Sequence, residues 1–365
     1  MIRVLQLLDA DAGYETETAA RQLARDASGT FTIDARTIGR GGTYSTSISA
    51  LLRLRRGRAI DGFDLVHAFG ARAMTVASVA SRRPIVYSPD RFPRAGDVRW
   101  LRAVAGARDV HVVAPTETMR RALVTRGLAL ERSHLIRPGV DFAHIKRRRD
   151  DALRTKLGFA PDDYVILAPG ESTRAAAHSL AVWAASILHV LDPKYRLLLW
   201  GRGPLAHQAE RFAHRTRQHG LMEVAERELR RRAPFERLMS ATDAVLVTAV
   251  EPEPTLPIAV CMAAALPIVA LVTPTTSELL EDRHTALMVG RAAPRILAQR
   301  VLDLRQDPGL QWTISDMART EAYEYFSMTR FLHQWRAVYR QIASGQKVEV
   351  PQQAPGAGLR FHGRA

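Results

Sequence analysis

The chain has 365 residues, of which 47% are hydrophobic and 24% are charged. This length and composition predict a globular protein with room for two domains, and they exclude a disordered or fibrous chain. The formal net charge of +15 is expected to attract phosphate groups, whether on nucleotides, nucleic acids or anionic lipids. The single cysteine, Cys261, excludes an internal disulfide and fits a reducing compartment.

The N-terminal residues 1–8 are apolar but too short for a signal peptide, and Asp9 and Asp11 follow directly. No stretch approaches the roughly 18 apolar residues of a transmembrane helix. We therefore expect a cytoplasmic protein, with a peripheral place at the inner membrane face as the alternative. The basic clusters at 53–58, 146–149 and 230–232 lack interleaved aromatic residues, which argues against nucleic acid and leaves an anionic membrane surface as a candidate partner.

In the first 145 residues, short apolar runs alternate with longer helical patterns. Such alternation predicts a parallel, doubly wound sheet, because a crossover helix is the usual way to join parallel neighbours. The expected strands cover residues 4–8, 31–35, 65–68, 85–87, 110–114 and 133–136, and the expected helices cover 18–27, 48–56, 73–81 and 117–126.

The pattern breaks near residue 137 and restarts at residue 164. The expected second set of strands covers 164–168, 195–200, 244–248, 267–271 and 287–289. The expected helices cover 179–191, 205–219, 292–306, 310–325 and 329–344, with a small-residue helix that Leu256-Pro257 opens and that includes 261–265, and another helix that opens at Glu278.

The chain is therefore expected to be an α/β protein with two Rossmann-like doubly wound domains. The expected boundaries are 1–145 for the first domain, 146–163 for a linker, 164–325 for the second domain, 326–343 for a closing helix and 344–365 for a disordered tail. A nucleotide-sized ligand is expected at the carboxyl ends of the strands, in the cleft between the domains.

Several short motifs occur in a fixed order along residues 1–343. They are Asp64-Leu-Val-His67, Leu135-Ile-Arg-Pro-Gly-Val-Asp141, Gly201-Arg-Gly-Pro-Leu205, Leu256-Pro257 and Asp307-Pro308. In this order and spacing they resemble the family-4 glycosyltransferases of GT-B fold. The resemblance implies that the first domain faces the acceptor and that the second binds a nucleotide-sugar donor. It also implies retaining transfer of a hexosyl unit to a glycan or cell-envelope acceptor, with no cofactor besides the donor.

In that family, an Arg and a Lys in the loop after the first strand of the second domain face the donor diphosphate, where fixed positive charge stabilises the leaving group. Glu171 and Ala176 hold those positions here. The resemblance leaves Gly170 and Arg174 as candidate donor-binding residues in this loop, and Gly201 and Gly203 in the next.

The family also places two glutamates around the Leu-Pro turn, one against the sugar and one against the ribose. Pro252 and Val260 replace them. Glu251 and Glu253 flank Pro252 and are the candidate catalytic carboxylates that remain.

A glycine pair of the family is replaced by Pro274-Thr275, while Glu278 remains as a candidate donor-binding residue. An alternative interpretation places Glu278 in a first helical turn, where it would interact favourably with the helix dipole.

The family's sugar-binding histidine of the first domain corresponds to Asp90, which can accept a hydrogen bond or act as a base. His67 at the end of its strand is either a packed side chain or a ligand contact. Residues 9–17 carry four carboxylates and one glycine, Gly13, and so predict an acidic helix N-terminus rather than a phosphate loop.

Two functions stay open at this point. One is glycosyl transfer with an altered donor site. The other is a catalytically inactive GT-B protein that binds a partner, a glycan or a membrane surface. The histidines show no spacing typical of a zinc site.

Overall fold

The computed structural model describes residues 1–39, 60, 62–92, 94–200, 205–218, 220–225, 229, 235–250 and 255–345. The chain divides into two compact units. The first comprises Met1–Arg137 together with the C-terminal residues from Thr329, and the second comprises Pro138–Met328. The first unit therefore combines the N-terminal part of the chain with the described residues that follow Met328.

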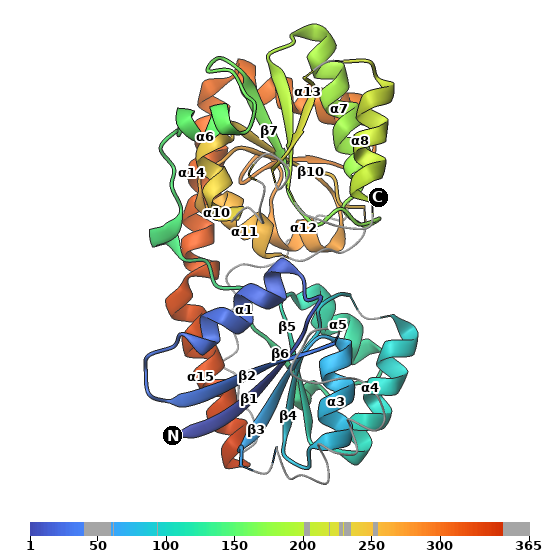
Figure 1. Cartoon of the computed structure of the whole chain (residues 1–365), viewed down its shortest axis with the longest axis vertical. Helices are drawn as coiled ribbons and strands as arrows, with labels where there is room; N and C mark the ends of the chain where they lie inside the picture. The colour runs from blue at the N-terminus through green and yellow to red at the C-terminus, as the bar shows by residue number, and fades with distance from the viewer. Residues whose placement is uncertain are drawn as a thin grey trace. The chain divides into compact units, whose positions relative to one another are not determined.

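The first unit is built on a six-stranded parallel sheet in the order β2-β1-β3-β4-β5-β6 (Figure 1). Its strands are β1 (Ile2–Asp9), β2 (Phe31–Ile38), β3 (Leu65–Phe69), β4 (Ile85–Ser88), β5 (Val110–Ala114) and β6 (Ser133–Leu135). All five residues of β3 are buried, as expected of a central strand that is covered on both faces. The parallel sheet predicted from the alternating pattern is confirmed.

Helices cover both faces of this sheet. One face packs against α3 (Ala71–Ala80), α4 (Ala95–Ala107) and α5 (Glu117–Thr125), which share a single apolar core with the strands. On the other face, Trp335 and Tyr339 of α15 (Met328–Ser344) make ring contacts with His67 of β3. The remaining helices are α1 (Tyr14–Ala24) and the short 3₁₀ turn η1 (Leu130–Arg132).

The second unit repeats the architecture with a six-stranded parallel sheet in the order β12-β11-β10-β7-β8-β9. Its strands are β7 (Tyr164–Ala168), β8 (Tyr195–Leu199), β9 (Met222–Val224), β10 (Ala244–Val247), β11 (Ile268–Leu271) and β12 (Leu287–Val289). Its helices are α6 (Asp151–Lys156), α7 (His178–Leu191), α8 (Ala206–Arg215), α10 (Phe235–Leu238), α11 (Leu256–Ala263), α12 (Pro274–Leu279), α13 (Pro294–Gln306) and α14 (Pro308–Phe326), with the 3₁₀ turns η2 (Phe142–His144) and η3 (Met239–Ala241).

Residues 146–163, expected as a linker, lie in the second unit and include α6. Arg154 of this helix is only 1% exposed and pairs with Asp243 at 3.0 Å. Its guanidinium also donates to the carbonyl oxygens of Ala241 and Asp163. The segment is packed because this buried arginine ties it to the amino ends of β7 and β10.

Three further helices differ from the sequence expectation. The helix α4 was not predicted, because only Val98 and Leu101 of its residues are buried and the apolar period is weak. The helix α11 begins at Leu256, as expected, because Pro257 occupies a first-turn position that tolerates proline, but it ends at Ala263 rather than Ala265. The helix α12 ends at Leu279, so Glu278 lies in its last turn and the first-turn interpretation is wrong. The expected helix at 48–56 lies outside the described residues, and so does the tail beyond residue 345.

Candidate functional site

Two carboxylates meet at the carboxyl edge of the first sheet. Asp9 ends β1, Gly70 follows β3, and Asp90 follows β4, and these three strands are neighbours. A methyl group on Gly70 would lie 2.7 Å from Oδ2 of Asp9 and 3.4 Å from Cγ of Asp90. Gly70 therefore provides the space in which the two acidic side chains come together.

Asp9 is buried and held in place by backbone donors. Its carboxylate accepts hydrogen bonds from the amide of Ala73 at 2.8 Å and from the amide of Arg72 at 3.3 Å, both in the first turn of α3. Burial, and then the charge of Asp90, raise the pKa of Asp9 to about 6 despite these donors. Asp9 therefore changes its charge close to neutral pH.

Asp90 is half-buried, and its Oδ1 atom has no hydrogen-bond partner within the described part of the chain, although this atom is shielded from solvent. A shielded carboxylate oxygen without a donor is costly unless a ligand supplies one. Asp90, predicted as a site residue from sequence, is therefore an acceptor available to a hydroxyl group. No sequence pattern indicates that Asp9 is its neighbour, because Asp9 belongs to the acidic stretch of residues 9–17.

That acidic loop leads into α1, whose N-terminal cap is Gly13 and whose first turn carries Glu15 and Glu17. The prediction of an acidic helix N-terminus is confirmed. Asp11 pairs with Arg72 at 2.8 Å at the surface.

The loop after β7 is the predicted donor loop of the second unit. Gly170 is buried with a φ of 107°, a left-handed conformation that favours glycine. Arg174 is exposed. Ala176 is only 2% exposed, and its carbonyl oxygen accepts a hydrogen bond from the hydroxyl of Thr248 at 2.8 Å. The position at which the family's lysine is expected is therefore part of the packed interior.

A serine and a histidine that the sequence analysis missed close this loop. The hydroxyl of Ser172 lies 3.0 Å from Nδ1 of His178, and both residues are buried. Burial lowers the pKa of His178 to about 4, so its imidazole is neutral at physiological pH. The carbonyl of Ser172 accepts the amide hydrogen of Leu205, and the amide of Val250 donates to Ala175. The only available sequence signal was the six-residue spacing of Ser172 and His178 around an apparent loop.

Helix α11 follows, and all eight of its residues are buried. Val260 is 1% exposed, and burial raises the pKa of the Cys261 thiol, which is typical of an inert packed cysteine. Cys261 therefore packs as a small hydrophobic residue.

Helix α12 is capped by its own threonines. The Thr273 hydroxyl accepts the amide hydrogen of Thr276 at 3.1 Å, and the Thr276 hydroxyl accepts the amide hydrogen of Thr273 at 2.8 Å. Pro274 therefore occupies the first helical position of a conventional capping box. Glu278 is half-buried at the other end of this helix.

Four predicted site residues, Gly201, Gly203, Glu251 and Glu253, lie outside the described residues. Within the described ranges, no three His, Cys, Asp or Glu side chains gather as metal ligands. No described helix is long and apolar enough to cross a membrane.

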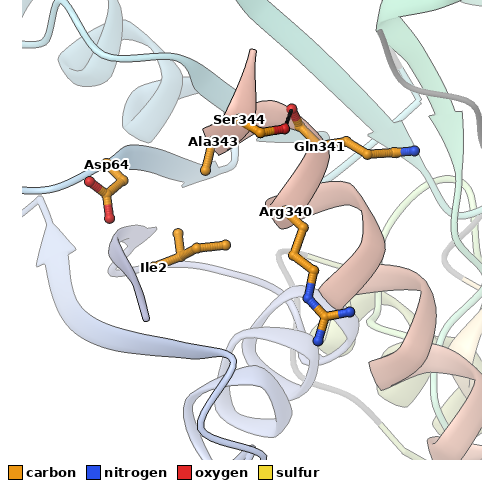
Figure 2. A pocket seen from close by; sticks show the side chains of 6 residues that line it. All are labelled: Ile2, Asp64, Arg340, Gln341, Ala343 and Ser344. Atoms are coloured by element: carbon orange, nitrogen blue, oxygen red, sulfur yellow. Dashed lines mark hydrogen bonds between the residues drawn. The ribbon is translucent and has the colours of Figure 1, made fainter. Parts of the chain in front are cut away.

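One pocket of the first unit lies away from this edge. It has a volume of about 500 Å³ and is lined by Ile2, Asp64, Arg340, Gln341, Ala343 and Ser344 (Figure 2). Ile2 begins β1 and Asp64 precedes β3, so the pocket lies at the amino ends of the strands. It is therefore not part of the candidate site.

The two sheets with their flanking helices define an α/β protein of GT-B fold. Residues 10–144 match the Glycosyltransferase Family 4 profile, which confirms the resemblance to that family over most of the first sheet. No curated protein is significantly similar in sequence to this chain.

Solved structures support the same fold over nearly the whole chain. Anabaena Alr3699/HepE in complex with UDP and glucose is 17% identical, covers 93% of this chain and 100% of its own, and gives a TM-score of 0.79. Sucrose-phosphate synthase from Thermosynechococcus elongatus is 15% identical, with coverages of 95% and 100% and a TM-score of 0.77. WaaG, a glycosyltransferase involved in lipopolysaccharide biosynthesis, is 14% identical, with coverages of 94% and 100% and a TM-score of 0.68. These structures show the fold, and the family match supports glycosyl transfer in general.

Proposed function

We propose that this chain transfers a hexosyl unit from a nucleotide sugar to a hydroxyl group of a glycan or cell-envelope acceptor. The observation that supports the proposal is the pairing of Asp9 and Asp90 across Gly70 at the carboxyl edge of the first sheet. Asp90 is the proposed catalytic residue. It accepts the hydrogen of the acceptor hydroxyl while the hydroxyl oxygen bonds to the anomeric carbon and the bond from that carbon to the diphosphate breaks.

The raised pKa of Asp9 fits this role. When Asp9 is protonated it reduces the negative charge beside Asp90, and when it is ionised it adds negative charge to the site that takes up the hydroxyl hydrogen. The proposed activity is therefore expected to rise with pH through about 6.

On the donor side, we assign the diphosphate contact to Arg174, the exposed cation of the loop after β7. HepE was solved with UDP-glucose, which supports a nucleotide sugar as the donor class. Glu251 and Glu253 remain proposed contacts of the sugar, and Gly201, Gly203 and Glu278 remain proposed contacts of the donor.

The test is a thermal-shift titration with UDP-, GDP- and ADP-sugars, followed by an assay for donor hydrolysis. We expect saturable stabilisation by one nucleotide family, and a several-fold weaker affinity in Arg174→Ala than in the control Arg295→Ala on α13. If none of the three nucleotide families stabilises the chain, the transferase proposal fails.

The internal hydrogen bonds of the loop after β7 favour a second candidate, a catalytically inactive GT-B protein that binds a partner or a glycan. Ser172 and His178 contact each other within the loop, and Thr248 after β10 hydrogen-bonds to it. Val260 presents no acceptor for a ribose. A buried ribose hydroxyl without a partner would cost about 1–3 kcal/mol. Glycan-induced stabilisation without any nucleotide response would support this candidate.

We further propose an anionic membrane surface as a partner, through α4. Arg99, Trp100 and Arg102 are exposed on this helix, so a membrane-compatible aromatic ring lies beside two cations. The chain should sediment with liposomes containing anionic lipid at low salt and less at high salt, and Trp100→Ala should sediment less than Trp183→Ala. Failure to bind at any salt concentration rejects the proposal.

A further inference from the structure

A series of hydrogen-bond contacts links α15 to the carboxyl edge of the first sheet through buried Tyr339, buried His67 and half-buried Ser88. The hydroxyl of Tyr339 lies 2.6 Å from Nδ1 of His67, and Nε2 of His67 lies 2.9 Å from the hydroxyl of Ser88. Ser88 is the last residue of β4, two positions before Asp90. This chain of contacts thus ends beside the proposed catalytic carboxylate.

Both inner members are uncharged. His67 and Tyr339 are fully buried, and burial lowers the pKa of His67 well below its ordinary value and raises the pKa of Tyr339. A neutral imidazole carries a single N–H group, so one of its two contacts donates and the other accepts. The tautomer of His67 therefore decides which group donates and which accepts at both contacts, with Tyr339 and with Ser88.

The two contact distances indicate which tautomer is present. The 2.6 Å between the Tyr339 hydroxyl and Nδ1 of His67 fits a hydroxyl donor and is shorter than an ordinary hydrogen bond from an N–H group, whereas the 2.9 Å between Nε2 and the Ser88 hydroxyl is the usual length for an N–H donor. The Tyr339 hydroxyl therefore donates to Nδ1, and Nε2 donates its hydrogen to Ser88.

The hydroxyl hydrogen of Ser88 is consequently not used by His67. At the same sheet edge, Oδ1 of Asp90 is shielded from solvent and has no hydrogen-bond donor in the described chain. A hydroxyl group needs one donor for its oxygen and one acceptor for its hydrogen. Ser88 and Asp90 together offer that pair.

We infer that Ser88 binds the acceptor hydroxyl oxygen while Asp90 receives its hydrogen, and that His67 and Tyr339 are positioning residues that fix the direction of the Ser88 hydroxyl. The inference rests on the proposed function and names the contact by which the first unit recognises its acceptor. The ligand class is a polyhydroxylated molecule such as a sugar. The C-terminal helix α15 thereby becomes part of the acceptor site through Tyr339.

The first test does not depend on activity. Nitrogen-15 chemical shifts of His67 in the full chain should show hydrogen on Nε2 and none on Nδ1. Hydrogen on Nδ1 would overturn the inference, because Ser88 would then donate to His67 and have no hydrogen left for a ligand.

The second test measures the Michaelis constants for donor and acceptor separately. Ser88→Ala and His67→Phe should raise the KM for the acceptor about five- to ten-fold, as expected for one lost hydrogen bond, and leave the KM for the donor unchanged. His67→Gln keeps an N–H group near the Nε2 position and should restore most of the acceptor affinity. Ser78→Ala on α3 is the matched control and should behave like wild type.

A purely structural role predicts a different result, in which the melting temperature falls and both Michaelis constants change together, and this result would contradict the inference. If the wild-type chain transfers no sugar, the proposed function fails on its own. The same variants are then compared by saturation-transfer NMR with methyl glucoside, methyl galactoside and methyl mannoside. Equal binding of these probes by wild type and Ser88→Ala, or no binding by either, would overturn the inference.

Discussion

At the residue scale, the cost of the buried carboxylate Asp9 can be measured. Because its pKa in the folded state is about 6, above the ordinary value of 3.8, the native state takes up a proton in this interval and stability falls as pH rises from about 4 to 6. Asp9→Asn should therefore raise the free energy of unfolding by about 2 kcal/mol at pH 7 and by little at pH 4.

Urea unfolding at the two pH values measures this difference. Asp11→Asn is the control, because Asp11 is exposed and its pair with Arg72 lies at the surface. An equal gain at pH 4 and pH 7 would show that the charge of Asp9 is not the cause.

Gly70 gives a second prediction at this scale. Its φ of 91° disfavours any side chain, and an added methyl would lie 2.7 Å from the Asp9 carboxylate. Gly70→Ala should lower the stability by about 1–3 kcal/mol and reduce any transfer activity, because Asp9 must move. Gly96→Ala is the matched control. It lies in α4 with open space around it and should be neutral or stabilising by about 0.5–1 kcal/mol. Similar thermal denaturation of the two variants would contradict the argument.

Sequence reasoning singled out Asp90 as a candidate but did not predict which residues surround it. The end of a strand predicts that a side chain reaches the sheet edge, but it does not say which neighbouring strand contributes a partner. The pairing with Asp9 depends on the order β1-β3-β4, and Ser172 meets His178 only after a loop folds back. Both contacts arise from the tertiary fold, and no periodic pattern in the sequence predicts them.

At the element scale, the strands other than the half-buried β9 were predictable because continuous apolar runs have few alternatives in a buried parallel sheet. Helices with weak periods were not, and α4 and α6 are the examples. The packing of α6 depends on a charged residue, Arg154, which hydrophobic patterns cannot assign to the interior.

The buried arginine should therefore be essential to its part of the second unit. Arg154→Met leaves the Asp243 carboxylate with a backbone donor from Val165 and a distant Arg149, and should lower the free energy of unfolding by about 2–4 kcal/mol. Arg149→Ala, at a side chain that is 43% exposed, should cost less than about 1 kcal/mol. Chemical denaturation of the two variants checks the prediction, and a harmless Arg154→Met would show that α6 holds without the ion pair.

At the scale of the whole molecule, the fold was predictable from the alternation of strands and helices, because parallel sheets need crossover helices. The assignment of α15 to the first unit was not predictable, because the sequence shows only an amphipathic helix after the second domain. Helix α15 packs on the first unit because the rings of Trp335 and Tyr339 contact His67.

The discontinuous first unit has a consequence for biosynthesis. Residues 1–137 leave the ribosome long before α15 is made. The sheet face that carries His67 and Phe31 is therefore not covered by α15 until the entire second unit has been synthesised. A fragment of residues 1–137 should therefore bind the dye ANS and unfold without cooperativity, whereas the full chain should not. A cooperative, dye-free fragment would show that the last helix is dispensable for folding. If the prediction holds, the second unit is an insertion that folds during synthesis while the first unit still lacks its last helix.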